Sequence, residues 1–248
     1  MQEIIKLVET ISVHRALNNR FYSKWTANPL PIEHIAIFAR NYWEYTWHFP
    51  ESLAGLIVNS QNLMARVEYT KILYSELGYG KAEKAHSFLF EQFLCDLSEK
   101  MGIPDYFSIQ NLKEKYPLLE VTEKLIQGQK RLYSQNLAVA AGAQLALECQ
   151  AYSMIAKLYE GARNYASLWP SMSSFHASCE FFYVHLGSAE KDHQEEALTA
   201  IRNIVKNDAA LMEKAKDGFD EHLNLIANFW DGIATEMDTK KCEERAGV

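Results

Sequence analysis

Apolar residues recur at helical spacing through almost the whole chain, and the residues that break helices fall between these stretches. The 248 residues contain only 11 glycines and 6 prolines, and no stretch bounded by turn residues alternates apolar and polar side chains as a half-buried strand does. The sequence therefore predicts an all-α fold. Hydrophobic residues make up 48% of the chain, which is enough for a packed core, and no internal repeat or low-complexity linker divides it.

Glycine and proline mark the ends of seven to eight expected helices. These helices cover residues 2–27, 31–59, 61–77, 81–101, a short piece within 105–117, and then 118–163, 171–206 and 209–237. Pro50 should kink the second helix, because its ring clashes with the preceding turn. We expect the long helix over 118–163 to bend near Gly142. Residues 1–238 should form a single domain, followed by a charged, frayed tail over residues 239–248.

Charge and apolar runs limit the classes of partner. The net charge is −7 and no block of like charge reaches five residues, so the sequence indicates no nucleic-acid or membrane surface. The longest apolar runs are shorter than a bilayer span, and the N-terminus lacks the layout of a signal peptide. The four cysteines form no Cys-x-x-Cys pair, which is typical of reduced thiols in the cytoplasm.

The segment from Phe181 to His193 places two histidines and a carboxylate within one expected helix. Glu190 and His193 are three residues apart and share a helix face, as in the Glu-x-x-His pairs of carboxylate-bridged di-iron bundles. His185 lies about 80° away from His193 on an ideal helix. One extra residue looped out near Gly187, as a π-bulge, would reduce this angle to about 20°. We therefore predict a π-bulge here and half of a metal site.

Two other places can supply the second half. Glu76 closes one expected helix and His86 sits one turn into the next, and the intervening Gly78-Tyr-Gly80 turn can aim both side chains at one point. Glu148 follows an almost wholly apolar run, and a buried carboxylate must be paired, protonated or metal-bound. The alternatives are a surface position for Glu76 with a half-buried His86, and a position for Glu148 on the outer helix face, paired with a lysine.

Together these places provide three carboxylates and three imidazoles, a set that suits two iron or manganese ions with open positions for O₂ and substrate. It matches structural zinc poorly, because such sites are closed and rich in cysteine. Asp192 and Glu196 are the alternative carboxylate ligands. The expected substrate pocket is lined by Tyr22, Tyr45, His48, Tyr152 and Phe182, with a hydrogen-bonded core position as the alternative for His48.

Aromatic residues and prolines form a distinctive pattern near the N-terminus. It comprises Arg20-Phe-Tyr-Ser-Lys-Trp25, Leu30-Pro31, Tyr42-Trp-Glu-Tyr45 and Phe49-Pro50. The pattern resembles the N-terminal signature of the haem-oxygenase-like helical superfamily, which includes TenA-type thiaminases, pyrroloquinoline-quinone synthase and CADD-like proteins. The resemblance extends from about residue 14 to residue 232 and implies a haem-oxygenase-like helical bundle.

The metal pattern resembles the di-iron branch of this superfamily, which has a Glu…His pair across two helices, a mid-chain Glu, and His-x3-Asp/Glu-x2-His. The resemblance implies that the ligands are Glu76, His86, Glu148, His185, Glu190 and His193, with Glu148 as the bridging carboxylate. The last motif here is His-x4-Glu-x2-His, one residue longer than the common form. This departure leaves Asp192 open as the alternative to Glu190. The resemblance also implies a homodimer.

The activity that the resemblance implies is a non-haem di-iron oxidase or oxygenase. It would use O₂ to oxidise a small organic molecule, with amino-acid-like and fatty-acid-like compounds as the expected substrates. A metal-free TenA-like hydrolase is one alternative and would need a thiol nucleophile, for which Cys149 and Cys179 are the candidates. A CADD-like binding or signalling protein with a vestigial metal site is the other alternative.

Overall fold

The structure is a computed structural model. It describes residues 2–206 and 208–246, apart from the side chains of residues 188–191 and 241–246. These residues form twelve α-helices and four short 3-10 helices, with no strand among them. The all-α prediction is therefore confirmed, whereas the expected number of seven to eight helices is too low.

Three of the expected helices are divided in the structure, and this division accounts for the larger number. The α-helices are α1 (Gln2–Thr10), α2 (Arg20–Ala27), α3 (Ile32–Asn59), α4 (Leu63–Glu76), α5 (His86–Lys100), α6 (Ile109–Lys115), α7 (Glu120–Ser134), α8 (Leu137–Ala162), α9 (Met172–Ser178), α10 (Glu180–Leu186), α11 (Ser188–Val205) and α12 (Ala209–Ala246). The 3-10 helices are η1 (Ile11–Val13), η2 (Gly78–Gly80), η3 (Ala82–Lys84) and η4 (Arg163–Leu168).

Asparagine caps explain two of these divisions. The side chain of Asn19 accepts a hydrogen bond from the backbone N–H of Tyr22 at 3.0 Å, which starts α2 as a separate helix. Asn136 likewise accepts from the backbone N–H of Ala138 at 2.9 Å, which starts α8. The helix expected over 118–163 is therefore broken before α8, and Gly142 lies within α8.

Gly142 lies at a close backbone contact between α8 and α12. A Cβ atom on Gly142 would lie 1.7 Å from the carbonyl oxygen of Ala215 on α12. Gly218 on α12 makes the reciprocal contact, since its Cβ would lie 2.0 Å from the carbonyl oxygen of Val139 on α8. Because neither glycine has a side chain, the two backbones can touch at this crossing.

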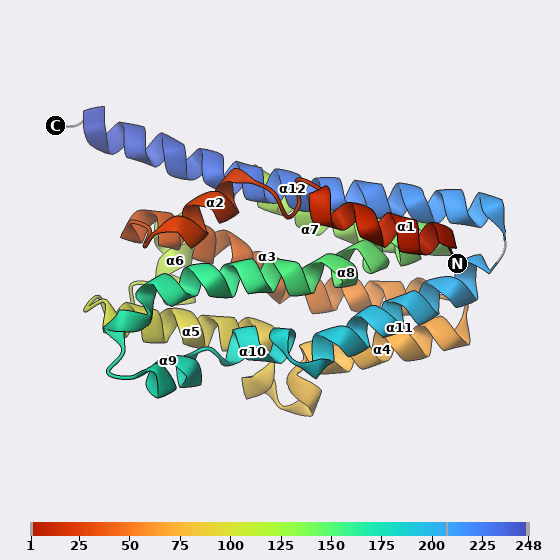
Figure 1. Ribbon diagram of the computed structural model, residues 1–248, viewed down its shortest axis with the longest axis horizontal. Coiled ribbons are helices and arrows are strands. Elements are labelled where there is room, and N and C mark those ends of the chain that lie inside the picture. The colour runs from red at the N-terminus through yellow and green to blue at the C-terminus, as the bar shows by residue number, and fades with distance from the viewer. Residues whose placement is uncertain (1, 207, 247–248) are drawn as a thin grey trace.

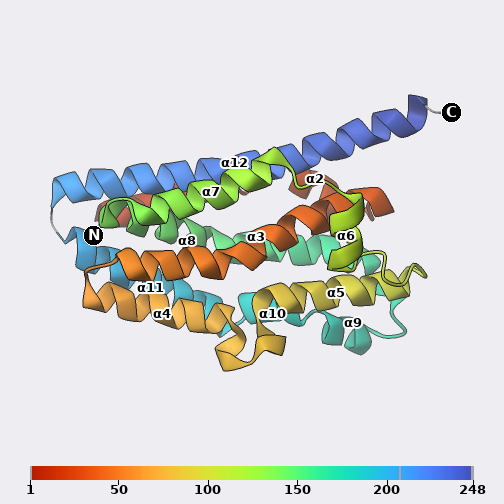
Figure 2. The ribbon, with the colours of Figure 1, turned by 180° about the vertical axis from the view of Figure 1, so that it is seen from behind.

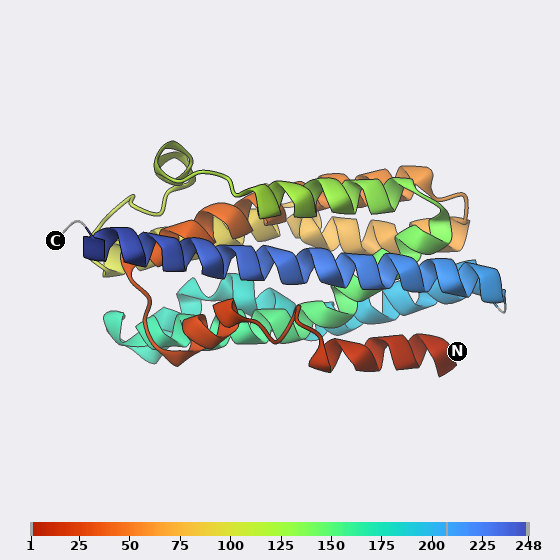
Figure 3. The ribbon, with the colours of Figure 1, turned by 90° about the horizontal axis from the view of Figure 1, so that it is seen from above.

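The long helices run roughly along the length of the molecule, with α8 at the centre. Figure 1 shows α12 along one long edge and α4 and α11 along the opposite edge, with α3 and α8 between them. The reverse view shows α7 beside α12 (Figure 2), and the view from above shows α12 lying between α7 and the N-terminal helices (Figure 3). Helix α8 packs against α2, α7, α10, α11 and α12 and so fixes the position of any side chain that it carries inward.

Helix ends only partly follow the sequence expectations. Helix α3 begins after Pro31 and runs through Pro50 to Asn59. Helix α12 continues beyond residue 238 as far as Ala246.

Within the described part of the chain, no helix combines the length and the apolar character that are needed to cross a membrane.

Candidate metal centre

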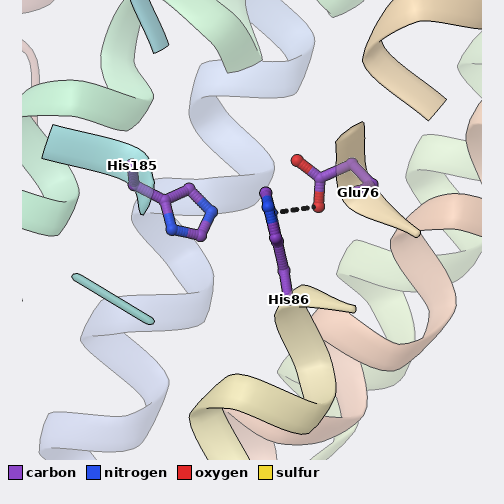
Figure 4. Close-up of side chains that lie close together, drawn as sticks. All are labelled: Glu76, His86 and His185. Carbon is purple, nitrogen blue, oxygen red and sulfur yellow. Dashed lines mark ion pairs between the residues drawn. The ribbon is translucent and has the colours of Figure 1, made fainter. Parts of the chain in front are cut away.

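Three of the predicted ligands meet at one point between α4, α5 and α10 (Figure 4). Glu76 is the last residue of α4, His86 is the first residue of α5, and His185 lies one residue before the end of α10. Each side chain offers one nitrogen or oxygen ligand atom, and these atoms all lie within 4.8 Å of one another. The cluster is therefore compact enough for the three side chains to hold one metal ion.

The turn between α4 and α5 aligns Glu76 with His86. Gly78 has a φ of +70°, and a Cβ at this position would lie 2.4 Å from the carbonyl carbon of Lys84, so only glycine fits. The chain folds back through η2 and η3, and Nδ1 of His86 comes to lie 2.9 Å from Oε2 of Glu76. Both residues are buried, which contradicts the alternative of a surface glutamate beside a half-buried histidine.

His185 is oriented by an interruption between α10 and α11. Helix α10 ends at Leu186, and Gly187 has an extended backbone with φ −84° and ψ −155° before α11 begins. The predicted π-bulge is therefore wrong, because the chain breaks the helix at Gly187 instead of bulging within it. Nδ1 of His185 donates to the carbonyl oxygen of Phe181 at 2.7 Å. Since a carbonyl can only accept a hydrogen bond, the proton of the neutral ring is on Nδ1. Nε2 therefore carries a free lone pair that can bind a metal.

Glu148 on α8 and His193 on α11 form a second buried pair. Nδ1 of His193 lies 3.6 Å from Oε2 of Glu148. Glu148 is only 3% exposed, which contradicts the alternative of an outer-face residue paired with a lysine. Nε2 of His193 is buried and has no hydrogen-bond partner among the described residues. A buried polar atom of this kind is costly unless a hydrogen bond or a metal satisfies it.

A cavity of about 50 Å³ joins these residues. Glu76, His86, Glu148 and His185 all line it, and the rest of its wall is mainly apolar and aromatic, including Phe181 from α10. Four of the six predicted ligands therefore face the same small space, and His193 lies next to it through its pair with Glu148.

Electrostatics set the charge of the cluster. Burial would raise the pKa of Glu76, but the nearby imidazoles of His86, His185 and His193 lower the pKa of that carboxyl to about 2. Burial, together with repulsion from His86, lowers the pKa of His185 to about 3. Burial also lowers the pKa of His193. At neutral pH, Glu76 is thus ionised while His185 and His193 are neutral, which are the protonation states that bind a metal.

The donor set fits iron. Imidazole nitrogens and carboxylate oxygens suit iron and manganese, whereas structural zinc sites favour thiolates, and the cluster of Glu76, His86 and His185 contains no cysteine. Nε2 of His193 is a further nitrogen donor, although neither His193 nor Glu148 belongs to this compact group of three. The residues that the structure describes are therefore suited to an iron ion at the cluster, with further donors beside it.

The structure describes the side chains of two of the three remaining carboxylates. The side chain of Glu190 lies outside the described residues. Asp192 is exposed. Glu196 is half-buried beside Lys71, whose Nζ lies 4.0 Å from Oε1 of that carboxylate. Among the described side chains, neither Asp192 nor Glu196 joins Glu76 at the cluster.

Of the five residues expected to line a substrate pocket, one lines this cavity. Tyr45 lines the cavity, but the other four residues lie elsewhere. Tyr22 packs among aromatic rings of α2 and α12, and His48 is paired with two carboxylates of its own helix. Tyr152 is exposed, and Phe182 packs against rings of α5 and α8. Successive residues of a helix point about 100° apart, so Phe182 faces away from the cavity.

Two residues that contact the candidate ligands were missed from the sequence. Phe181 lines the cavity and also holds His185 through its carbonyl oxygen. Gln144 lies one turn before Glu148 and donates a hydrogen bond to it. The signal for Gln144 was a lone amide within an otherwise apolar helical run, since a buried polar group needs a partner.

Two solved structures share the fold. A CADD-like protein of unknown function from Nostoc punctiforme PCC 73102 has a TM-score of 0.75 at 14% sequence identity, with 95% of this chain and 97% of that chain covered. A TenA homologue from Pseudomonas syringae pv. tomato strain DC3000 has a TM-score of 0.72 at 16% identity, with 94% of this chain and 91% of that chain covered. At these identities the likeness establishes the fold alone.

The family follows from the sequence itself. No curated protein matches the chain. The family model described as iron-containing redox enzyme matches residues 36–227, which is more than half of the chain and includes all six predicted ligands. The predicted haem-oxygenase-like superfamily is therefore confirmed, and the chain belongs to the family of iron-containing redox enzymes.

Proposed function

We propose that the protein is a non-haem di-iron oxidase or oxygenase that uses O₂ to oxidise a small organic molecule. The observation that carries this proposal is the convergence of Glu76, His86 and His185 beside the buried pair of Glu148 and His193, around one mainly apolar cavity. Membership of an iron-containing redox family supports the choice of metal and of reaction class.

Glu76, His86 and His185 would hold one iron, and His193 would hold a second. Glu148 would bridge the two ions, because it lines the cavity with the first group and faces His193 at 3.6 Å. Glu190 remains the proposed sixth ligand from its Glu-x-x-His spacing with His193. Ferrous ions bound there would supply electrons for the reduction of O₂. Manganese is the alternative metal, since it takes the same ligands.

The protein itself would orient the ligands and keep water away. The carbonyl oxygen of Phe181 fixes the ring of His185, as such hydrogen bonds to metal-bound histidines do. The aromatic wall would limit the entry of water during the reaction. Burial raises the pKa of Tyr45 well above its usual value, so its hydroxyl remains protonated and can donate a hydrogen bond to a substrate at the cavity wall.

The cavity limits the substrate. A volume of about 50 Å³ holds a few waters and is too small for most organic molecules, so a substrate must displace side chains in order to bind. Met154 in the cavity wall is flexible and suited to such movement. No lysine or arginine is present among the described residues of the wall. This favours a fatty-acid-like compound whose hydrocarbon part reaches the site, over an amino-acid-like compound bound through its charged groups.

The thiols give less support to the hydrolase alternative. Burial raises the pKa of Cys179 to about 12, so this side chain stays a thiol at neutral pH and is a weak nucleophile. Neither Cys149 nor Cys179 is among the described residues that line the cavity.

Iron-dependent O₂ uptake tests the proposal. The metal-free protein is loaded with ferrous iron without oxygen, O₂ is added, and its uptake is recorded with an oxygen electrode. Wild-type protein should consume O₂ in proportion to bound iron, and Glu148→Ala should lose this uptake, since alanine suits the alanine-rich helix but provides no ligand. Glu196→Ala is the matched control, because it removes a half-buried carboxylate of α11 outside the cluster. Iron-loaded wild-type protein without uptake, or Glu148→Ala with wild-type uptake, would contradict the proposal.

A further inference from the structure

A buried hydrogen-bonded chain leads from Glu148 to α7. Nε2 of Gln144 donates to Oε1 of Glu148, the hydroxyl of Tyr133 donates to Oε1 of Gln144, and Nε2 of Gln129 donates to that hydroxyl at 3.2 Å. Gln144 and Glu148 lie one turn apart on α8, and Gln129 and Tyr133 lie one turn apart on α7. All four residues are buried.

The hydrogen bonds of this series all donate in the same direction, from Gln129 towards Glu148. The hydroxyl of Tyr133 accepts from Gln129, so its own proton is available for the carbonyl oxygen of Gln144. With this oxygen engaged, the amide nitrogen of Gln144 must face Glu148. Tyr133 therefore determines which end of the Gln144 amide reaches the carboxylate. The reversed amide would place an oxygen against the carboxylate and leave both without a hydrogen.

The two carboxylate oxygens of Glu148 have different neighbours. Oε1 is held by Gln144, whereas Oε2 faces His193. A hydrogen bond to a buried ionised carboxylate both stabilises its charge and fixes its rotamer. Partners of this kind commonly orient carboxylate and histidine ligands and strengthen metal binding.

We infer that Gln144, itself oriented by Tyr133, is a positioning residue that presents Oε2 of Glu148 to the metal centre. This inference rests on the proposed function of Glu148 as a metal ligand. The chain sets an orientation and does not conduct protons, because an amide nitrogen is too weak an acid to pass a proton from Tyr133 to the carboxylate. Its effect should therefore be seen in ferrous-iron affinity.

Equilibrium binding of ferrous iron to the metal-free protein tests the inference. Binding is measured without oxygen, in competition with a coloured ferrous chelator. Gln144→Met keeps the length of the side chain but removes its hydrogen bonds, and it should weaken iron binding by about 10- to 100-fold. Tyr133→Phe should weaken binding less, because Gln144 can still donate but is free to reverse. The double variant should bind iron as weakly as Gln144→Met alone, because both changes act through one amide.

Tyr69→Phe is the matched control. It also removes a buried tyrosyl hydroxyl, and this hydroxyl has no hydrogen-bond partner among the described residues. Iron affinity in this variant should equal that of wild type, and circular dichroism verifies that each variant is folded. If Gln144→Met does not fold, Tyr133→Phe, which removes a single oxygen atom, carries the test.

The possible outcomes separate this inference from the proposed function. Wild-type protein that binds no iron would contradict the metal centre itself. Wild-type protein that binds iron, together with unchanged affinity in Gln144→Met and Tyr133→Phe, would overturn the positioning role alone. Additive losses in the double variant would also overturn it, since two residues that act through one carboxylate contact cannot contribute independently.

Discussion

Replacing Gly142 with alanine should destabilise the protein, whereas the same replacement at Gly55 should stabilise it. Both glycines lie inside α-helices, where alanine is intrinsically favoured by about 1 kcal/mol. Their surroundings differ. A Cβ at Gly142 would lie 1.7 Å from the carbonyl oxygen of Ala215, while a Cβ at Gly55 would meet nothing within 4 Å.

The size of the effect at Gly142 follows from this overlap. Cβ atoms essentially never approach another atom within 3.0 Å, so α8 and α12 would have to separate locally by more than about 1 Å. Overpacking of this kind costs about 1–3 kcal/mol, and the opposing atoms are backbone atoms that cannot rotate away. After the helix preference of alanine, about 1 kcal/mol, is subtracted, the net loss should be up to about 2 kcal/mol. Gly55→Ala should gain about 0.5–1 kcal/mol.

Thermal unfolding followed by circular dichroism measures both changes. Each kcal/mol should move Tm by roughly 2–4 °C in a protein of this size, so the two variants should lie on opposite sides of wild type. A Tm for Gly142→Ala at or above that of wild type would refute the backbone contact between α8 and α12. The position of Glu148, which α8 carries, would then need revision.

Three further predictions concern the cluster and the thiols. Glu76→Gln should weaken ferrous-iron binding in calorimetric titration, because it removes the charge paired with His86; unchanged affinity would exclude Glu76 as a ligand. The metal-free protein should lose stability as the pH falls from about 6.5 towards 3, because the pKa of His185 is depressed to about 3 in the folded state and the unfolded chain takes up the proton first. In this range His185 contributes about 1.4 kcal/mol of unfolding free energy per pH unit. Urea denaturation at several pH values should therefore show that the free energy of unfolding falls less steeply with decreasing pH in His185→Gln than in wild type. An equal dependence on pH would contradict the pKa shift of His185. Cys179→Ser should retain iron-dependent O₂ uptake, and its loss would favour a thiol-dependent reaction.

Helix type could be predicted from the sequence because it depends on local spacing. The second helix, expected over residues 31–59, is α3 over Ile32–Asn59, since Pro31 marks its start. The starts of α2 and α8 were missed because Asn19 and Asn136 lie within otherwise continuous helical patterns. An asparagine in such a pattern becomes an N-cap only when tertiary packing turns the chain there.

The candidate site could be predicted only where the sequence itself restricts geometry. Glu76 and His86 come together because the glycines between them permit one tight turn. The residues beside the site depend instead on how each helix is rotated, which decides between Phe181 and Phe182 at the cavity. The partner that Tyr133 provides for Gln144 depends on how α7 packs against α8, and no local pattern encodes this.

The stoichiometry of ferrous-iron binding tests the central claim most directly. The metal-free protein is titrated with ferrous iron under anaerobic conditions, and bound iron is counted against protein concentration. The two-ion site predicts saturation at about two irons per chain, and Glu148→Ala should bind fewer than two. Absence of iron binding by folded wild-type protein would contradict a metal centre at Glu76, His86, His185, Glu148 and His193.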